Sequence, residues 1–409
     1  MTKSDMMRKQ RIKNICNNWD LRDFAYVNFQ PDESLSEAHR AWQGCPTVAA
    51  TRAGRIFAGW YTGGAFEPCI NNYNVLVKSD DGGKSWSLPI LSIHSDYEKR
   101  NRNIDIQLWL DFENRLWVMR TASPYYETSK PASIKGFLNG EKQDYHREFT
   151  HTEVMICNDP DAEELIWEKP RIMCEGFMRC KPICTSTGLI IAPAYAYESP
   201  QYKLRYSDHN GVDFHNISIE GKPDVDVYDE IAVCEISPGK LRFLARTNRG
   251  YYVYSDSLDG GNTWTVAKEY EKAPSSRCYY GKLKNGMIAY VRNISDEKRI
   301  GMKICLSEDG GETFPYEMIL DNRENLSYPD LDEDEHGNIY IVYDRERDNF
   351  IKLNKETWVS EAAKEILVCK ITVDDLKNNM LSNGSFLGKI ISKAAFFMGF
   401  LRKKLMLKL

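Results

Sequence analysis

The sequence predicts an all-β protein, folded as a six-bladed β-propeller with a short amphipathic helix at its C-terminal end. Two observations carry this prediction: a turn motif that recurs along the chain, and a series of short apolar strands between turn residues. A multi-stranded unit that recurs at a period of about 50 residues is typical of a propeller blade. The copies of the motif are KSDDGGKSWS at 78–87, RYSDHNGVDF at 205–214, YSDSLDGGNTWT at 254–265 and CLSEDGGETFP at 305–315.

Each copy has the pattern of a tight hairpin turn followed by an aromatic residue. In the copy around Asp259, the central Asp, Gly and Asn residues tolerate the positive φ values that such turns require. Trp264 then returns a large apolar side chain to a sheet face. The copy at 205–214 is degenerate, because His209 and Asp213 replace the expected Asp and Thr.

We expect six comparable strands between residues 40 and 372 to open the inner part of one blade each. Five of them follow Gly or Asn turns, and the other follows Pro-Gly. About 330 residues shared among six units gives about 55 residues per unit, which suits a blade. The strands are GRIFAGWY, RLWVMRT, GLIIAPAYAY, KLRFLART, GMIAYVRN and NIYIVYD. The chain therefore divides into an N-terminal extension (1–39), the propeller (40–372) and a C-terminal tail (373–409).

The C-terminal tail breaks the β pattern. Between Ser385 and Lys408 it contains six Lys or Arg residues and no acidic residue. At about 100° per residue the cations gather on one side of a helix, with Ile391, Met398 and Leu401 opposite. This composition is typical of a helix that lies in a membrane interface. We expect peripheral contact with the inner membrane surface through Ser385–Lys408; the alternative is a helix docked on the propeller.

The composition is that of an ordinary soluble globular protein and restricts its partners and location. A net charge of −5 argues against nucleic acid as a main partner. The 11 cysteines lack CxxC spacing and predict free thiols in a reducing compartment, and the basic N-terminus lacks the apolar segment of a signal peptide. We therefore expect a cytoplasmic protein, and no pattern predicts a metal site or a cofactor.

The recurrent turn motifs resemble the Asp-boxes (bacterial neuraminidase repeats) of the sialidase superfamily, and the chain from about residue 40 to 370 resembles its six-bladed propellers. The resemblance implies that the boxes are structural: the Asp caps the turn, and the aromatic residue packs between strands. Trp86, Trp264 and Phe314 are then expected to be buried. Because the boxes are not the active site, function has to be argued from other residues.

The resemblance implies catalysis by a Tyr nucleophile, an activating Glu, an acidic acid/base residue and three arginines that bind a substrate carboxylate. A neutral nucleophile avoids charge repulsion at an anionic sugar, and a nearby carboxylate accepts its proton. The segment LSYPDLDEDEHG is similar to the family's nucleophile segment and places Tyr328 in that role. By the same resemblance, YDEIAVCEISPGKLRFLARTNRG assigns the activating Glu to Glu230 and one arginine to Arg246, and KRIGMKICLSEDGG assigns another to Arg299.

The sequence departs from the family pattern at the first arginine and at the acid/base position. The family has Arg-Ile-Pro before blade one, where this chain has Gly44-Cys45-Pro46. Glu67 is the acidic residue available for the acid/base role. Arg277, Arg179 or Lys181 would have to supply the missing positive charge, and Arg277 is the substrate-binding residue that we predict.

The sequence thus predicts an exo-sialidase-like glycoside hydrolase that cleaves a terminal acidic sugar, sialic acid or a related one, from glycans. The missing arginine favours an alternative, a hydrolase or lyase of a uronic-acid-containing glycan on the same scaffold. A second alternative is a non-catalytic glycan-binding propeller. All three have a glycan or acidic sugar as partner.

Overall fold

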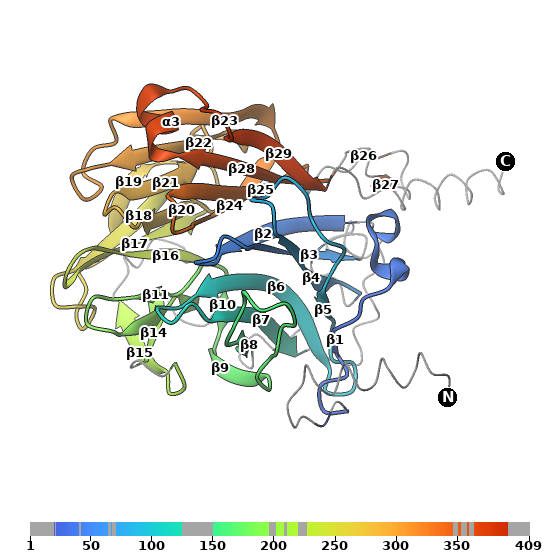
Figure 1. Cartoon of the computed structure of the whole chain (residues 1–409). Helices are drawn as coiled ribbons and strands as arrows, with labels where there is room; N and C mark the ends of the chain where they lie inside the picture. Colours follow the sequence, from blue (N-terminus) through green and yellow to red (C-terminus); the bar gives the residue numbers. More distant parts are fainter. Residues whose placement is uncertain are drawn as a thin grey trace, which may run out of the picture.

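The computed structural model describes residues 20, 22–40, 42–63, 67, 71–124, 150–195, 202–207, 211–219, 227–346, 351–352, 358–359 and 364–391. Six antiparallel sheets form the blades of a propeller (Figure 1). Strands β2 and β24, in the first and last blades, contact each other, as β2 and β6 do. The ring of blades therefore closes between its two ends. The predicted all-β, six-bladed fold is confirmed.

The first three blades extend from the N-terminal part of the chain to residue 219. Blade 1 contains β2 (Trp42–Ala50), β3 (Ile56–Gly63), β4 (Tyr73–Ser79), β5 (Leu91–Ile93) and β1 (Val27–Asn28). Blade 2 contains β6 (Asn101–Leu110), β7 (Leu116–Pro124), β8 (His151–Cys157) and β9 (Arg171–Glu175). Blade 3 contains β11 (Ile183–Cys184), β12 (Ile190–Ala192), β14 (Tyr202–Ser207) and β15 (His215–Ile219), next to a small ribbon of β10 (Phe177–Met178) and β13 (Ala194–Tyr195).

The other three blades follow the same order from the inner to the outer strand. Blade 4 contains β16 (Val227–Ser237), β17 (Lys240–Thr247), β18 (Tyr251–Ser257) and β19 (Lys268–Lys272). Blade 5 contains β20 (Tyr279–Lys282), β21 (Ile288–Arg292), β22 (Ile300–Ser307) and β23 (Tyr316–Glu324). Blade 6 contains β24 (Leu326–Glu333), β25 (Asn338–Arg345), β28 (Glu365–Thr372) and β29 (Phe386–Ile391).

Few described segments lie outside these sheets. They are the 3-10 turns η1 (Glu33–Leu35) and η2 (Glu37–His39), the helix α3 (Val373–Asn378), and a ribbon of β26 (Ile351–Lys352) and β27 (Trp358–Val359). A capping box at Thr372 and Asp375 starts α3. None of the helices in the described ranges has the length and apolar character that crossing a membrane requires.

The predicted domain boundaries do not match the blades. At the N-terminal end, β1 pairs with β5, and the buried Tyr26 and Phe29 join the core of blades 1 and 2, so part of the predicted extension belongs to blade 1. At the C-terminal end, β29 pairs with β28 and completes blade 6. The propeller therefore continues beyond residue 372, to Ile391.

The predicted helix from Ser385 is wrong for its first residues, because 386–391 form β29. Burial alternates along this strand: Phe386 and Ile390 are half-buried against the core, while Leu387 and Lys389 are exposed. This period of two is typical of a strand, and it also covers the otherwise open edge of β28. Residues 392–409, which carry most of the predicted basic helix, lie outside the described residues.

The complete Asp-boxes share one hydrogen-bond pattern. In the box of blade 4, the Ser257 hydroxyl donates to Asp259 at 2.8 Å and accepts from the backbone N–H of Gly261 at 2.8 Å. The Asp259 carboxylate also accepts from the backbone N–H of Thr263 at 2.9 Å. Blades 1 and 5 repeat these contacts around Asp81 and Asp309. The Asp therefore caps the turn, as the resemblance implied.

The aromatic residues of the boxes pack between blades, which differs from the expected position between strands. Trp86 of blade 1 packs against Tyr340 and Val342 of blade 6, and Trp264 packs against apolar residues of blades 3 and 4. Phe314 packs at the boundary between blades 4 and 5. All three are half-buried, because a turn at the blade rim covers only one side of the ring. The boxes thus join neighbouring blades.

We expect Trp264→Ala to lower the free energy of unfolding by about 3 kcal/mol, because it empties a position between two blades. It also removes the indole N–H bond to the Gly261 carbonyl, which is 2.9 Å long. Urea denaturation measures the change. Leu258→Ala in the same turn is the control, because Leu258 is 76% exposed and should cost little. Equal stability of the two variants would contradict the proposed joining role of the box.

Candidate active site

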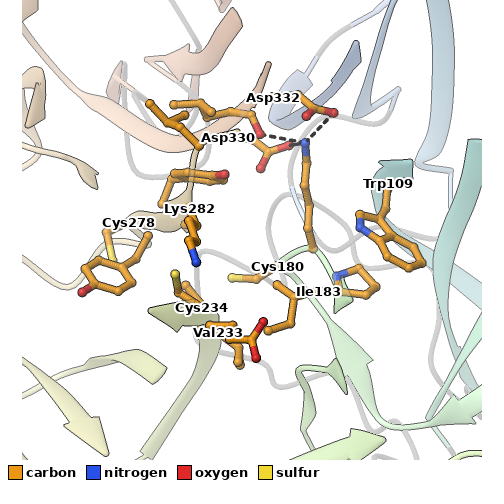
Figure 2. Close-up of a pocket in the computed structure, with 18 of the residues that line it drawn as sticks. Trp109, Cys180, Ile183, Val233, Cys234, Cys278, Lys282, Asp330 and Asp332 are labelled. Atoms are coloured by element: carbon orange, nitrogen blue, oxygen red, sulfur yellow. Dashed lines mark hydrogen bonds and ion pairs between the residues drawn. The ribbon is translucent and has the colours of Figure 1, made fainter. Parts of the chain in front are cut away.

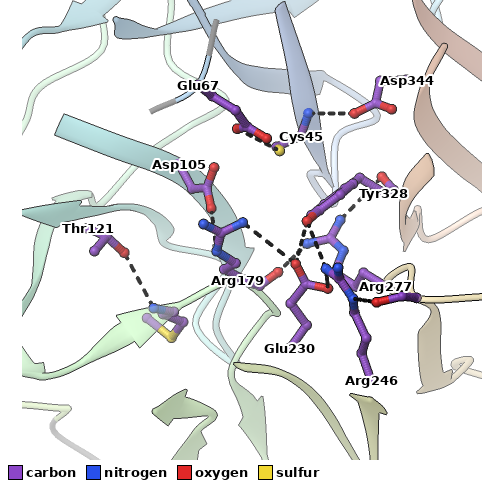
Figure 3. A network of polar contacts seen from close by, with 12 residues as sticks. Cys45, Glu67, Asp105, Thr121, Arg179, Glu230, Arg246, Arg277, Tyr328 and Asp344 are labelled. Carbon is purple, nitrogen blue, oxygen red and sulfur yellow. Dashed lines mark hydrogen bonds and ion pairs between the residues drawn. The ribbon is translucent and has the colours of Figure 1, made fainter. Parts of the chain in front are cut away.

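The inner strands of four blades are each interrupted by an irregularity in pairing. These interruptions lie between Gly44 and Thr47 in β2, Ile104 and Ile106 in β6, Val227 and Ile231 in β16, and Ser327 and Asp330 in β24. Cys45, Asp105 and Tyr328 have positive φ values of 55°, 34° and 55° at these positions. Since a β-bulge redirects a side chain, the bulges aim residues from separate blades toward one centre (Figure 3).

Tyr328 and Glu230 meet at this centre. The Tyr328 hydroxyl donates to Glu230 Oε1 at 2.5 Å, and Arg246 Nη1 donates to Glu230 Oε2 at 2.8 Å. The same Arg246 nitrogen lies 3.2 Å from the Tyr328 hydroxyl oxygen (Figure 3). Tyr328 and Glu230 are only 3% and 2% exposed. The predicted contact between Tyr328 and Glu230 is therefore confirmed, and it occurs in a nearly dry environment.

The charges around this pair keep the proton on the tyrosine. Burial raises the pKa of Glu230, but the positive charges of Arg246 and Arg179 outweigh it and hold the pKa at about 2. Burial and the Glu230 charge raise the pKa of Tyr328 well above its usual value. At neutral pH the site therefore contains an ionised carboxylate hydrogen-bonded to a neutral phenol.

Arg246 and Arg299 both lie near Tyr328 and share a contact with Ser275. Arg246 Nε donates to the Ser275 hydroxyl and Arg299 Nη2 to the Ser275 carbonyl, both at 3.1 Å. The Arg299 guanidinium carbon lies 5.8 Å from the centre of the Tyr328 ring. Both arginines are half-buried, and Ser275 also lines an open groove of about 760 Å³. The structure therefore brings together four of the predicted residues.

Arg277 lies below the Tyr328 ring and not beside the hydroxyl. It is 2% exposed, and its guanidinium carbon is 5.3 Å from the ring centre. Its guanidinium donates to backbone carbonyls, those of Pro46, Arg179, Tyr328 and Pro329. These bonds tie blades together near the axis. The geometry does not support the predicted substrate-binding role of Arg277, because its donors face the backbone.

Arg277 also separates the site from an axial cavity of about 340 Å³, which Arg277 and Pro329 line (Figure 2). In this cavity the Lys181 ammonium lies 3.3 Å from Asp330 and 3.6 Å from Asp332. Lys181 further donates to the Leu331 carbonyl at 2.8 Å. Lys181 is thus engaged away from Tyr328 and does not replace the missing arginine.

Arg179, from the connection between β10 and β11, is the additional cation at the centre. Its Nε lies 2.9 Å from Asp105 Oδ2, and its Nη1 lies 3.6 Å from Glu230 Oε1. Arg179 was one of three residues that the sequence offered for the missing charge, whereas Asp105 was not predicted at all. Asp105 has no motif around it, and the weak signal for it is an Asp inside the apolar strand NIDIQLWL.

Cys45, Glu67 and Asp105 form the opposite side of the site. Gly44 of β2 occupies the position of the family's first arginine, pairs with Tyr61 of β3 and has no side chain that could bind a substrate. The next residue, Cys45, donates its thiol to Glu67 Oε2 at 3.8 Å, and its backbone N–H donates to Asp344 at 2.7 Å. Burial and the Glu230 charge raise the pKa of Asp105, against the effect of Arg179. This side therefore carries acidic groups where the family has a cation.

The comparisons with known proteins agree with this fold. Residues 156–341 match the BNR repeat-like domain family. A NanB sialidase variant from Streptococcus pneumoniae has a TM-score of 0.61 at 14% identity, covering 86% of this chain and 71% of that one. An intramolecular trans-sialidase from Ruminococcus gnavus has a TM-score of 0.61 at 15% identity, covering 86% and 98%.

A leech intramolecular trans-sialidase is similar as well, with a TM-score of 0.60 at 13% identity over 86% of this chain and 71% of that one. No curated protein matches the sequence. Identities this low support a shared fold, while the matched repeats agree with the Asp-boxes in blades 3 to 5. Residues 156–341 therefore match a BNR repeat-like domain, and the six-bladed propeller of the chain has the fold of the sialidases.

Proposed function

We propose that the chain is a glycoside hydrolase that releases a terminal acidic sugar, with Tyr328 as the nucleophile and Glu230 as its base. One observation carries the proposal: the buried 2.5 Å hydrogen bond from the Tyr328 hydroxyl to Glu230, with Arg246 contacting both. A tyrosine held against an ionised, buried carboxylate has the arrangement of a nucleophile with its base. The fold similarity to sialidases supports the same reaction class.

The geometry suggests the order of events in the first step. The phenolic oxygen bonds to the anomeric carbon while the bond from that carbon to the leaving oxygen breaks, and the leaving oxygen keeps the bonding electron pair and takes a proton from water. As the phenolic oxygen of Tyr328 loses electron density, its proton becomes more acidic. The proton passes to Glu230 Oε1, 2.5 Å away. Arg246 stays within 3.2 Å of the phenolic oxygen and so stabilises negative charge on it.

The cations around the pair favour a carboxylate-bearing sugar. Arg246 and Arg299 flank Tyr328 and are half-buried, a position in which a charge-assisted bond to a carboxylate is strong. The absent side chain at Gly44 favours a second candidate, a hydrolase or lyase of uronic-acid-containing glycans. Its substrate would present the carboxylate differently from sialic acid.

A panel of acidic-sugar glycosides tests the proposal. We expect turnover of at least one sialoside or uronoside, and weak inhibition by a sialic acid transition-state analogue because one arginine contact is missing. Tight binding of that analogue would show that another cation replaces the missing arginine. Binding of glycans without turnover of any of them would support the non-catalytic propeller instead.

We also propose that the end of the chain contacts anionic membranes. Residues 392–409 contain Lys393, Arg402, Lys403, Lys404 and Lys408 and no acidic side chain. Each cation near an anionic leaflet contributes about 1 kcal/mol. Deletion after Ile391 should abolish co-sedimentation with anionic vesicles at low salt and leave the melting temperature unchanged. A full-length protein that ignores these vesicles would rule the contact out. A deletion that also removes residues 386–391 is unsuitable, because these residues form β29.

A further inference from the structure

The side of the site formed by Cys45, Glu67 and Asp105 gathers three acidic groups without a matching number of cations. One ligand-type atom from each, the thiol sulfur and two carboxylate oxygens, lies within 4.8 Å of the others. Cys45 and Asp105 are each 2% exposed, and Glu67 is half-buried. The three residues come from β2, the segment after β3, and β6, so the fold assembles the cluster from distant parts of the chain.

The two carboxylate oxygens of Asp105 differ in their contacts. Its Oδ2 pairs with Arg179 Nε at 2.9 Å, while its Oδ1 is buried and has no hydrogen-bond partner in the part of the chain that the structure describes. Figure 3 shows the Asp105 carboxylate between Arg179 on one side and Cys45 with Glu67 on the other. A buried carboxylate oxygen without a partner costs free energy. A cation placed between the three side chains would satisfy it.

The arrangement fits a small tetrahedral metal site. Zinc–oxygen and zinc–sulfur bonds of about 2.0–2.3 Å place neighbouring ligand atoms roughly 3.5 Å apart. The distance from Cys45 Sγ to Glu67 Oε2 is 3.8 Å, close to that spacing. Arg179 would act as the outer partner that orients the Asp105 ligand, as commonly seen around ligating carboxylates.

We propose that Cys45, Glu67 and Asp105 bind one Zn²⁺ ion at the edge of the active site. A thiolate ligand favours zinc over magnesium and calcium, which prefer oxygen alone. Three protein ligands leave the fourth tetrahedral position open, as in zinc sites that bind a substrate.

The position of the ion suits it to bind the carboxylate of the substrate. This part of the inference rests on the proposed function. Cys45 directly follows Gly44, where the family's first arginine would stand. A divalent cation here supplies the positive charge that this position lacks, and its open coordination position takes the carboxylate of an acidic sugar. Glu67 then serves as a ligand and not as the acid/base residue predicted from the sequence.

Metal binding is measured without any substrate, so its failure is distinct from failure of the proposed hydrolase activity. The full-length protein is incubated with Zn²⁺, dialysed and analysed for metal content. A second sample is titrated with Co²⁺, whose absorption spectrum reports thiolate ligation and tetrahedral geometry. We expect about one equivalent of Zn²⁺ per chain, and a thiolate-to-cobalt charge-transfer band.

Two single variants and a control identify the ligands. Cys45→Ser should remove the charge-transfer band, and Glu67→Gln should weaken metal affinity by more than the roughly 10–100-fold typical of changing an outer-shell partner. Cys184→Ser is the matched control, because Cys184 is a half-buried thiol that lines the axial cavity instead. It should bind metal as the unaltered protein does. Circular dichroism confirms that each variant is folded.

Several results would overturn the zinc site. These are less than stoichiometric zinc after dialysis, a cobalt spectrum without a thiolate band, or unchanged metal binding in folded Cys45→Ser. In the absence of a metal, Glu67 would return to the acid/base role predicted from the sequence. If zinc binds but no acidic glycoside is turned over, the metal site stands and the proposed function fails.

Discussion

We expect Tyr328→Phe to lower kcat by at least about 1,000-fold, because the variant has no atom that can form the covalent bond to the sugar. The loss should not come from unfolding. Removal of the hydroxyl costs one hydrogen bond to a charged group, about 1.5–3 kcal/mol, and Glu230 keeps its bond to Arg246 at 2.8 Å. Steady-state kinetics on the best substrate, with melting curves of the same samples, separates the two effects.

Tyr343→Phe is the matched control for this variant. Tyr343 is a buried tyrosine of blade 6, 2% exposed, whose hydroxyl lies 3.5 Å from Asp321 and away from the site. It should lose a comparable hydrogen bond and keep its activity. Wild-type turnover by Tyr328→Phe would eliminate the proposed nucleophile.

We also expect Glu230→Gln to lower kcat, because Glu230 is the proposed base. A neutral amide accepts a proton far less readily than a carboxylate, so kcat should fall by about 100–10,000-fold. Glu235→Gln on the same strand is its control, because Glu235 accepts bonds from Ser186 and Gly239 outside the site. The Glu230 pKa of about 2 further predicts that this residue causes no change in rate between pH 4 and 8.

The repeated Asp-boxes made the fold predictable. Ser, Asp, Gly and Thr recur at fixed offsets because each turn needs the same hydrogen bonds, as around Asp259. The boundary errors have a different origin. Residues 386–391 carry both a helical and an alternating apolar pattern, and only the unpaired edge of β28 decides between them. The sequence of one strand does not show which edge of a sheet the strand will pair with.

The candidate site was predictable to the extent that it lies in family-like segments. Tyr328 and Glu230 come from such segments, and the structure places them together. Asp105 and Arg179 lie outside recognisable motifs and reach the centre only because blades 2 and 3 converge there. Arg277 differs from these residues: it was predicted to bind substrate, and in the structure its guanidinium donates to backbone carbonyls.

We expect Arg246→Met to lower the free energy of unfolding by about 3–5 kcal/mol at pH 8, because it leaves the buried Glu230 carboxylate short of a partner. Glu230 keeps the hydrogen bond from the neutral Tyr328 hydroxyl, while the Arg179 Nη1 cation lies 3.6 Å away. Arg242→Met is the control on the same strand. The partner of Arg242, Asp256, is 21% exposed and can be hydrated, so the cost should be smaller.

The pH dependence of this loss identifies its cause. In the wild type, Glu230 has a pKa of about 2, lowered from 4.5, so its ionised form contributes stability above pH 4.5 that is lost as the pH falls toward 2. Without Arg246, burial dominates and raises the folded-state pKa above 4.5. The variant's stability should then decline as the pH rises from 4.5 toward that pKa. Between pH 4.5 and pH 8 the difference in stability between the two proteins should therefore be smallest at pH 4.5 and largest at pH 8, and it should shrink further as the pH falls from 4.5 toward 2.

The double variant Glu230→Gln/Arg246→Met completes the test. It removes the uncompensated charge, so it should regain much of the stability that Arg246→Met loses, and its difference from wild type should change little between pH 5 and 8. Urea denaturation of the four proteins of this cycle at both pH values gives the coupling energy. A loss in Arg246→Met that is the same at both pH values, or a double variant no more stable than Arg246→Met, would show that Arg246 stabilises the centre by packing and not by holding the charge of Glu230.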